Sequence, residues 1–302
     1  VGTDDGKLWL TPDSGRSWKD LSEAVPREAR GLWVSRVEPS RFEEGRAYVS
    51  VTGYREDVFR PMLYVTEDYG LTFQSLSSNL PDDQNINVVR EDPRNEDLLF
   101  AGAENGAYAS VDGGGEWARL GKNLPKVPVH DIVAHPRDRE LAIATHGRGM
   151  YVLDIASLEQ WTESNTRSGA FVVQPNVARR FPRGPDGGYT RAPRTFTAPN
   201  PSGAELCAYL AGGFRKAELR VVNAAGKVLT KHSLPAEGGL HRVVWNLTSS
   251  QRPAGMRGIA NRFRRFFGSR RGRGRRFQVQ PGRYRIELEV DGKVEVKPLE
   301  VK

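Results

Sequence analysis

One eight-residue pattern recurs along this chain, and its first copy is Thr11-Pro12-Asp13-Ser14-Gly15-Arg16-Ser17-Trp18. It returns as Thr66-Glu67-Asp68-Tyr69-Gly70-Leu71-Thr72-Phe73, and more loosely as Ser110-Val111-Asp112-Gly113-Gly114-Gly115-Glu116-Trp117. Each copy has a hydroxyl residue, an Asp two positions on, a Gly two further and an aromatic residue three beyond that. This pattern predicts a hairpin turn, because the carboxylate accepts turn amides and Gly permits a positive φ.

Apolar strands recur with the same period as these turns. Three of them end near Pro39, Pro93 and Pro136, and their spacings of 54 and 43 residues match the spacings of 55 and 44 between the turns. A further strand precedes each turn or its expected place: Leu8-Trp9-Leu10, Leu63-Tyr64-Val65, Ala107-Tyr108-Ala109 and Met150-Tyr151-Val152. Short strands at a period in the forties or fifties are typical of β-propeller blades, which have four antiparallel strands each.

The repeated turn resembles the Asp-box of sialidase-like and sortilin-like β-propellers. The resemblance implies that Asp13, Asp68 and Asp112 are structural Asp-box carboxylates. The third copy departs most from the pattern, because Glu116 replaces the second hydroxyl residue. Stretches such as Ala144-Thr145-His146-Gly147-Arg148-Gly149 resemble sequences in the C-terminal blades of bacterial glycosyl-hydrolase-like repeat proteins. Those proteins are related to xyloglucanase-type propellers. The resemblance covers about residues 1–156.

We therefore predict an all-β chain that begins with an incomplete β-propeller over residues 1–158. This range supplies about three and a half blades, too few to close a ring, since propellers use at least four. We expect the other blades to lie upstream in a longer protein, or the segment to dimerise.

The pattern changes after Leu158. Scattered Pro, Gly and Arg predict a connecting segment over residues 159–200. Six or seven short strands in residues 201–302 predict an antiparallel β-sandwich, and the sequence around Trp245 resembles fibronectin-type, immunoglobulin-like modules. We expect Trp245 to be the core aromatic residue. Cys207 is the only cysteine, so it forms no internal disulfide, and we expect it to be a small core residue.

The net charge of +8 comes from one segment of the chain. Residues 252–276 hold ten arginines and no acidic residue, so the remainder of the chain has a net charge of −2. A specific nucleic-acid partner is therefore not expected for the folded domains.

The Arg-rich insertion, residues 252–276, allows two interpretations. Ile259, Phe263, Phe266 and Phe267 have helical spacing, so a short amphipathic helix could lie on an anionic membrane, on a wall polymer or on RNA. In that case the contacts come from Arg262, Arg264, Arg265, Arg270 and Arg271. The alternative is a disordered loop between two sandwich strands, which the Gly and Arg content favours.

The loops between the second and third strands of each blade, and the connections between blades, are expected opposite the Asp-boxes. In propellers this is the face that usually binds ligand. We predict that it holds the following residues: Asp4, Arg55, Asp57, Asp82, Glu104, His146 and Arg148. Polar residues are also common in hairpin loops for local reasons, so a purely structural role is the competing interpretation.

Two functions of different classes remain open. A glycoside hydrolase needs two carboxyl groups across a groove, one protonated and one charged. The candidates are Asp4, Asp5, Asp57, Asp82 and Asp83, and no catalytic pair stands out among them. We therefore favour a non-catalytic propeller that binds a carbohydrate or protein ligand, with a xyloglucanase-like hydrolase as the alternative.

The histidines do not indicate a metal site, because His130, His135 and His146 lack the ligand spacing of zinc. We expect neither a metal nor a cofactor. The resemblance implies an exported protein, extracellular or periplasmic, although no signal peptide is visible in this sequence.

Overall fold

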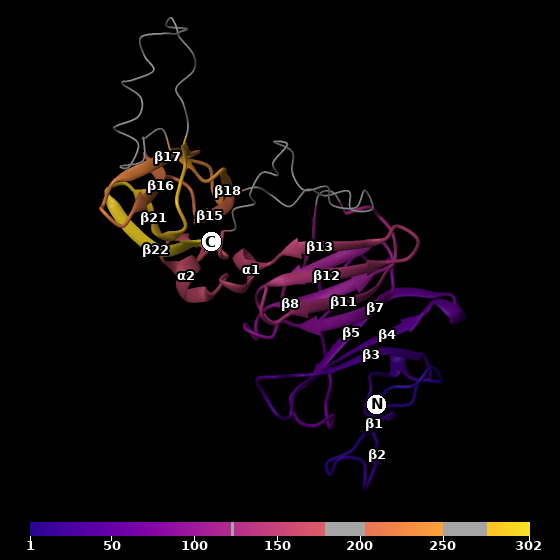
Figure 1. Cartoon of the computed structure of the whole chain (residues 1–302). Coiled ribbons are helices and arrows are strands. Elements are labelled where there is room, and N and C mark those ends of the chain that lie inside the picture. Colours follow the sequence, from indigo (N-terminus) through magenta and orange to yellow (C-terminus); the bar gives the residue numbers. More distant parts are fainter. Residues whose placement is uncertain (122–123, 179–202, 250–276) are drawn as a thin grey trace, which may run out of the picture. The chain divides into compact units, whose positions relative to one another are not determined.

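The computed structural model describes residues 1–121, 124–178, 203–249 and 277–302 (Figure 1). Antiparallel sheets dominate these residues, which confirms the predicted all-β class. The chain divides into two compact units, Val1–Thr162 and Glu163–Lys302. The Arg-rich insertion, including Arg262, Arg264, Arg265, Arg270 and Arg271, lies outside the described residues.

The first unit consists of four successive sheets of the blade type, which we name blades A to D. Blade A contains β1 (Trp9–Leu10) and β2 (Lys19–Asp20). Blade B contains β3 (Trp33–Pro39), β4 (Ala47–Gly53), β5 (Val58–Thr66) and β6 (Gln74–Ser75). Blade C contains β7 (Ile86–Glu91), β8 (Leu99–Ala103), β9 (Gly106–Ser110) and β10 (Ala118–Arg119). Blade D contains β11 (Val129–His135), β12 (Glu140–Thr145) and β13 (Met150–Asp154).

Three short helices accompany these strands: η1 (Arg27–Ala29), η2 (Tyr54–Glu56) and α1 (Ala156–Glu159). In blades B and C each strand pairs with the next in the chain, so the sheets are simple meanders. Figure 1 shows β1 and β2 at one end of the unit and β13 at the other.

Apolar clusters hold each blade against its neighbour. Leu63 and Val65 of blade B pack with Ile86 and Leu99 of blade C, and all four side chains are nearly inaccessible to solvent. Similar clusters join blade A to blade B and blade C to blade D. Alternate residues of a strand point to opposite faces of its sheet, so a blade with neighbours on both sides needs apolar residues at nearly every position. The fully buried strand β9 shows this pattern.

The repeated stretches form turns with the same hydrogen bonds. In the second copy, Asp68 Oδ1 accepts the amide hydrogen of Thr72 at 2.9 Å, and Asp68 Oδ2 accepts its hydroxyl at 2.7 Å. The amide of Gly70 donates to Thr66 Oγ1 at 2.8 Å, and Gly70 has a φ of +82°. The Asp13 turn has the corresponding contacts from Ser17 and Gly15.

The third turn keeps only part of this set. Asp112 Oδ1 accepts the amide of Glu116 at 2.9 Å, and Gly114 donates to Ser110 Oγ at 2.8 Å. Glu116 has no hydroxyl, so it cannot make the second hydrogen bond that Ser17 and Thr72 make.

The second unit contains two sheets that share one apolar core. The first sheet has the order β14 (Ala170–Val172), β15 (Ala204–Leu210) and β18 (Gly239–Trp245). The second has the order β17 (Val228–Leu234), β16 (Ala217–Asn223), β21 (Gly282–Val290) and β22 (Lys293–Val301). A small sheet pairs β19 (Thr248–Ser249) with β20 (Phe277–Gln278). Trp245 and Cys207 are buried, as predicted, and the immunoglobulin-like resemblance stays a prediction.

The boundary between the units differs from the expected connecting segment, residues 159–200. The second unit begins at Glu163 with α2 (Glu163–Arg167) and includes β14. Phe171 and Val172 explain the difference, because β14 pairs with β15 and both side chains are buried. Their apolar character outweighs the surrounding Pro and Gly residues, which suggested a linker.

Candidate functional site at the loop face of the blades

The strand registers place the candidate loops and the Asp-boxes at opposite ends of each blade. Arg55 lies before β5 and Asp68 after it, so the two residues flank opposite ends of one strand. Glu104 and Asp112 flank β9 in the same way. His146 and Arg148 precede β13, whose far end pairs with the start of β12 at Glu140. We name the end with Arg55, Glu104 and His146 the loop face.

Hydrogen bonds between neighbouring blades hold the loop face together. The amide of Val34, at the start of β3, donates to Thr3 O in the turn of blade A at 3.0 Å. Gly53 N donates to Asn85 Oδ1 of blade C at 3.3 Å. The side chain of Asn87 donates to Glu104 Oε1 at 3.1 Å and to Val129 O of blade D at 3.4 Å. The side chain of Glu104 is therefore positioned by Asn87 of its own blade.

The most developed side-chain cluster on the loop face surrounds Arg55. Its Cζ lies 4.5 Å from the ring centroid of Trp33 and 5.7 Å from that of Tyr54. The two rings are 6.1 Å apart and tilted by 54°. Arg55 Nη1 lies 3.7 Å from Asp4 Oδ2, and Arg55 Nε donates to the Tyr54 hydroxyl at 3.2 Å. Three elements thus converge: the turn of blade A, η2 and the first residue of β3.

Two predicted residues, Asp4 and Arg55, are therefore in direct contact. The aromatic partner Trp33 was not among the residues singled out from the sequence. It opens a strand of mixed polarity, and only the fold brings it beside η2. The usable signal was the aromatic residue Tyr54 next to Arg55 in a loop between the second and third strands.

The other predicted residues lie in separate loops. Asp57 follows η2 with a left-handed φ of 56° and an exposed side chain, and Asp82 is exposed in the connection between blades B and C. The His146 ring lies 5.4 Å from that of His130, and its backbone amide donates to Pro128 O at 2.8 Å. Arg148 is exposed between Gly147 and Gly149, which both have a φ of +80°.

Two candidate carboxylates of the loop face, Asp4 and Asp5, have local partners. Asp5 accepts a hydrogen bond from the Thr3 hydroxyl, which holds the pKa of Asp5 below its usual value. Asp4 Oδ2 lies 3.7 Å from Nη1 of Arg55. Burial raises the pKa of Asp92 to about 6, but this side chain is fully buried and follows β7 at the Asp-box end. It cannot reach a ligand on the loop face.

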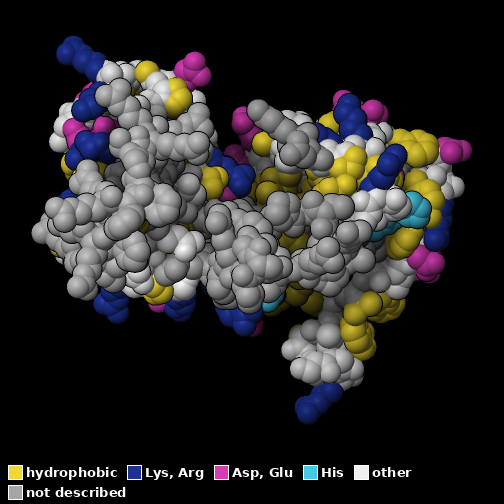
Figure 2. Space-filling view, turned by 45° about the horizontal axis from the view of Figure 1, so that its top comes forward, with side chains coloured by type: hydrophobic (Ala, Val, Ile, Leu, Met, Phe, Trp, Pro, Cys, Tyr) yellow, Lys and Arg dark blue, Asp and Glu magenta, His cyan; other side chains and the backbone are white. Residues whose placement is uncertain are grey.

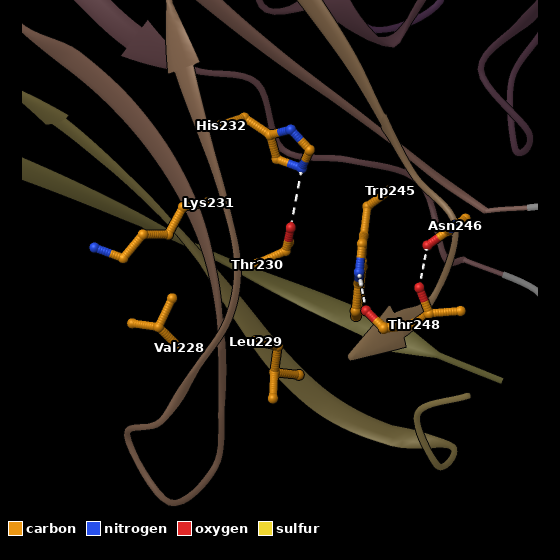
Figure 3. Close-up of a pocket in the computed structure, with 8 residues that line it drawn as sticks. All are labelled: Val228, Leu229, Thr230, Lys231, His232, Trp245, Asn246 and Thr248. Carbon is orange, nitrogen blue, oxygen red and sulfur yellow. Dashed lines mark hydrogen bonds between the residues drawn. The ribbon is translucent and has the colours of Figure 1, made fainter. Parts of the chain in front are cut away.

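The second unit has a cavity of about 480 Å³ of its own (Figure 3). Its lining includes Thr230, whose Oγ1 lies 3.2 Å from His232 Nε2, and Trp245, whose Nε1 donates to Thr248 O at 2.9 Å. Burial lowers the pKa of His232. These polar groups satisfy one another, and the lining reaches β19, where the described residues stop before position 250.

In the described ranges, no group of three or more His, Cys, Asp or Glu side chains is arranged to hold a metal ion. The helices found there are also too short to cross a membrane.

No protein-family model and no curated protein matches the chain. Among solved structures, a GH74 enzyme of Niastella koreensis is similar at 14% identity with a TM-score of 0.40, covering 76% of this chain and 34% of that one. The extracellular domain of a putative one-component system from B. thetaiotaomicron is similar at 10% identity and a TM-score of 0.36, covering 100% and 36%. YCF48 bound to D1 peptide gives 13% identity and a TM-score of 0.35, covering 76% and 62%.

This chain therefore spans about a third of the length of the GH74 enzyme. All three TM-scores lie below 0.5, and the fold of this chain follows from its own strand pairing.

Proposed function

We propose that this chain is a propeller segment that binds a carbohydrate or protein ligand through its loop face. The observation that carries the proposal is the cluster of Trp33, Tyr54, Arg55 and Asp4. Tyr54 is 44% exposed, and the side chains of Arg55 and Asp4 are 48% and 71% exposed. Aromatic residues and arginine supply much of the binding energy at recognition surfaces, because they offer large contact areas with polar atoms at their edges.

The contacts within the cluster fix its shape before a ligand arrives. The guanidinium of Arg55 is stacked on one ring and paired with Asp4, so less side-chain entropy is lost on binding. An aromatic face beside hydrogen-bonding groups suits a sugar, whose C–H groups pack on the ring while its hydroxyls meet the charged edge. A peptide with an apolar side chain next to a polar backbone has the same character.

Binding is favoured over hydrolysis because two of the candidate carboxylates, Asp4 and Asp5, already have local partners. A retaining or inverting glycosidase needs one carboxyl group that is protonated near neutral pH. Asp5 has a lowered pKa, and Asp4 is paired with a cation. We therefore propose a binding role rather than the xyloglucanase-like alternative.

The proposal also includes the cellular location of the protein and the neighbours of this segment. The resemblance to exported repeat proteins supports an extracellular or periplasmic location, with further blades of the same protein beside this segment. Contact with an anionic polymer or membrane through the Arg-rich insertion stays a proposal about residues outside the described ranges.

The test is affinity gel electrophoresis of the chain in gels that contain neutral polysaccharides, with xyloglucan and a mixed-linkage β-glucan as first probes. Arg55→Ala and Trp33→Ala should abolish retardation in the gel that retards the parent chain. Arg16→Ala is the matched control, since it removes the same charge from an exposed position in an Asp-box at the opposite end of the blades. Binding of the same variants to a peptide library tests for a protein ligand. Equal binding by all variants in both assays would refute this site.

A further inference from the structure

The turn around Asp68 exposes two large apolar side chains at its tip. Tyr69 and Leu71 are 50% and 60% exposed. The hydrogen bonds that define this turn come from Thr66, Asp68 and their amide partners, and none of them uses the side chain of Tyr69 or Leu71. The equivalent residues are small or polar in the other two turns: Ser14 and Arg16 in the first, Gly113 and Gly115 in the third. The turn therefore forms without apolar side chains at these positions.

The backbone at Tyr69 has a conformation that bulky residues rarely adopt. Its φ is 59°, and the equivalent residues Ser14 and Gly113 have values of 58° and 71°, so the turn needs a positive φ at this position. Glycine adopts such a φ without steric cost, whereas a large side chain is disfavoured there. Local stability thus does not account for Tyr69. Strained positions of this kind are concentrated at sites with a function.

A third exposed aromatic residue lies in the adjoining loop between β3 and β4. The Tyr69 amide donates to Gly45 O of this loop at 3.0 Å, and a Cβ placed on Gly45 would lie 3.4 Å from Cε2 of the Tyr69 ring. Phe42, in the same loop, is 40% exposed, and its amide donates to Ser40 Oγ at 3.1 Å. We name Phe42, Tyr69 and Leu71 the Tyr69 patch.

Single exposed apolar residues need no special explanation. Figure 2 shows hydrophobic side chains next to charged ones on the face that it presents, as on most protein surfaces. The Tyr69 patch differs because its three large side chains come from two adjoining segments at one end of one blade. Blade B also packs against blade A on one side and blade C on the other, so the patch is not the uncovered side of a blade.

The surroundings of the Tyr69 patch are acidic. Residues 40–46 and 66–73 contain four acidic residues and two arginines, which gives a net charge of −2. Arg46 is bound to Glu67 and Glu96. Glu43 and Glu44 are exposed, and neither has a cation partner among the described residues. The charge of Glu44 raises the pKa of Tyr69, which places this carboxylate beside the ring.

We propose that the Tyr69 patch docks a protein partner that presents an apolar side chain flanked by lysine or arginine. Exposed aromatic residues supply much of the binding energy at protein interfaces, and the unpaired carboxylates of Glu43 and Glu44 complement basic groups. A polypeptide is favoured over a sugar because Phe42 and Leu71 offer no polar side-chain atoms for hydroxyl groups. The patch lies at the Asp-box end of blade B, so this partner binds apart from the ligand of the loop face.

The test begins with selection of a random phage-displayed peptide library on the full chain. We expect a class of enriched peptides in which an apolar residue is flanked by lysine or arginine. Fluorescence anisotropy with these peptides, synthesised and labelled, then compares variants. The double variant Tyr69→Ser with Leu71→Arg copies the tip of the first turn, and it should weaken binding at least about tenfold. Glu43→Gln with Glu44→Gln should weaken binding and reduce its dependence on salt.

Two controls separate this surface from others. The same pair of changes in β22, Val294→Ser with Val296→Arg, alters side chains that are 54% and 50% exposed in the second unit and should leave binding unchanged. Arg55→Ala should also leave it unchanged, so loss of the loop-face site and loss of the Tyr69 patch are distinguishable.

The variant Tyr69→Ser with Leu71→Ser repeats the test without adding charge, and far-UV circular dichroism checks that each variant is folded. Failure to enrich any basic, apolar peptide overturns the proposal. Equal binding by the parent chain and a folded Tyr69 and Leu71 variant also overturns it, as does binding that is lost only in Arg55→Ala.

Discussion

Arg90 Nη1 donates to Glu38 Oε2 at 2.6 Å and so ties the first strand of blade C to the first strand of blade B. The same guanidinium donates from Nη2 to Asp131 Oδ1 at 3.0 Å and from Nε to Ile132 O at 2.7 Å, both in blade D. The Arg90 and Glu38 side chains are only 19% and 13% exposed. One residue therefore links three consecutive blades, and much of its charge is shielded from water.

Replacing Arg90 should destabilise the first unit more than replacing an exposed arginine. Arg90→Ala leaves the carboxylate of Glu38 without its cation and removes one of the two cations of Asp131, which keeps Arg36 Nη2 at 2.8 Å. We expect a loss of about 2 kcal/mol in the free energy of unfolding. This figure is below that of a fully buried pair because Asp131 is half exposed. Urea denaturation measures the change. The control is Arg137→Ala, whose pair with Asp138 is exposed to water and should contribute little to stability. Equal losses in the two variants would contradict this account.

The blades could be predicted from the sequence because their signals are local. A turn such as that of Asp68 is formed by residues within eight positions, and the strand Leu63-Tyr64-Val65 precedes it at a fixed offset. Turn chemistry and alternation of apolar residues need no knowledge of distant contacts. The same applies to the buried Trp245, whose strand alternates in polarity.

The cluster around Arg55 could be predicted only in part, because it depends on how one blade meets the next. Trp33 and Arg55 come together through the registers of β3, β4 and η2, and Asp4 joins from a different blade. The contact of Arg90 with Glu38 has the same origin, since the two residues are 52 positions apart. Local patterns carry no information on the rotation between sheets, so such contacts cannot be predicted from one sequence.

Asp68→Ala should lower the melting temperature of the first unit, because the amide and hydroxyl of Thr72 lose their acceptor. We expect a decrease of about 3 °C or more. The matched control is Asp82→Ala at an exposed position, which should leave the melting temperature unchanged. Ligand binding at the loop face should persist in Asp68→Ala. A loss of binding without a loss of stability in Asp68→Ala would mean that the turn itself contacts ligand.

The Asp68 turn also makes the stability of the first unit depend on pH. Hydrogen bonds from the hydroxyl and amide of Thr72 lower the pKa of Asp68 to about 2, from an ordinary value of 3.8. The carboxylate is therefore favoured in the folded state, so its stabilising effect is complete above pH 3.8 and is lost as the pH falls through about 2. The difference in melting temperature between the parent chain and Asp68→Ala should shrink over that range. A constant difference down to pH 2 would be inconsistent with this pKa.

Glu116→Thr should stabilise the third Asp-box. Thr72 Oγ1 donates to Asp68 Oδ2 at 2.7 Å, and Ser17 Oγ does the same to Asp13, whereas Glu116 offers only its amide to Asp112. A threonine supplies the absent hydroxyl, and a net hydrogen bond of this kind is worth about 0.5 to 1 kcal/mol. The control is Glu116→Val, because valine has the same shape as threonine but no hydroxyl. If valine and threonine have the same effect on the free energy of unfolding, the gain does not come from the hydrogen bond.

Asp92 should make the first unit less stable at neutral pH than at mildly acidic pH. Burial and the charge of Glu159 raise its pKa to about 6, although the amides of Arg94 and Asn95 donate to Oδ1. Oδ2 of Asp92 and Oε1 of Glu159 are buried and have no hydrogen-bond partner. The cationic side chains next to Glu159 are those of Arg94 and Arg139, and Arg139 donates to Glu159 Oε2 rather than Oε1. The folded state therefore binds a proton at Asp92 more tightly than the unfolded state does.

The sign of the pH dependence follows from this raised pKa. At pH values below 3.8 the carboxyl is protonated in both states and no penalty applies. Between pH 3.8 and about 6 the unfolded state loses its proton first, so stability falls as the pH rises, and above pH 6 the full penalty remains. Asp92→Asn removes the charge and keeps an oxygen for the two amides. We expect it to gain about 2 kcal/mol over the parent chain at pH 7.5 and nothing at pH 4 in urea denaturation. Asp82→Asn, at an exposed position, should follow the parent chain at both pH values, and a pH-independent difference for Asp92→Asn would show that Asp92 keeps an ordinary pKa.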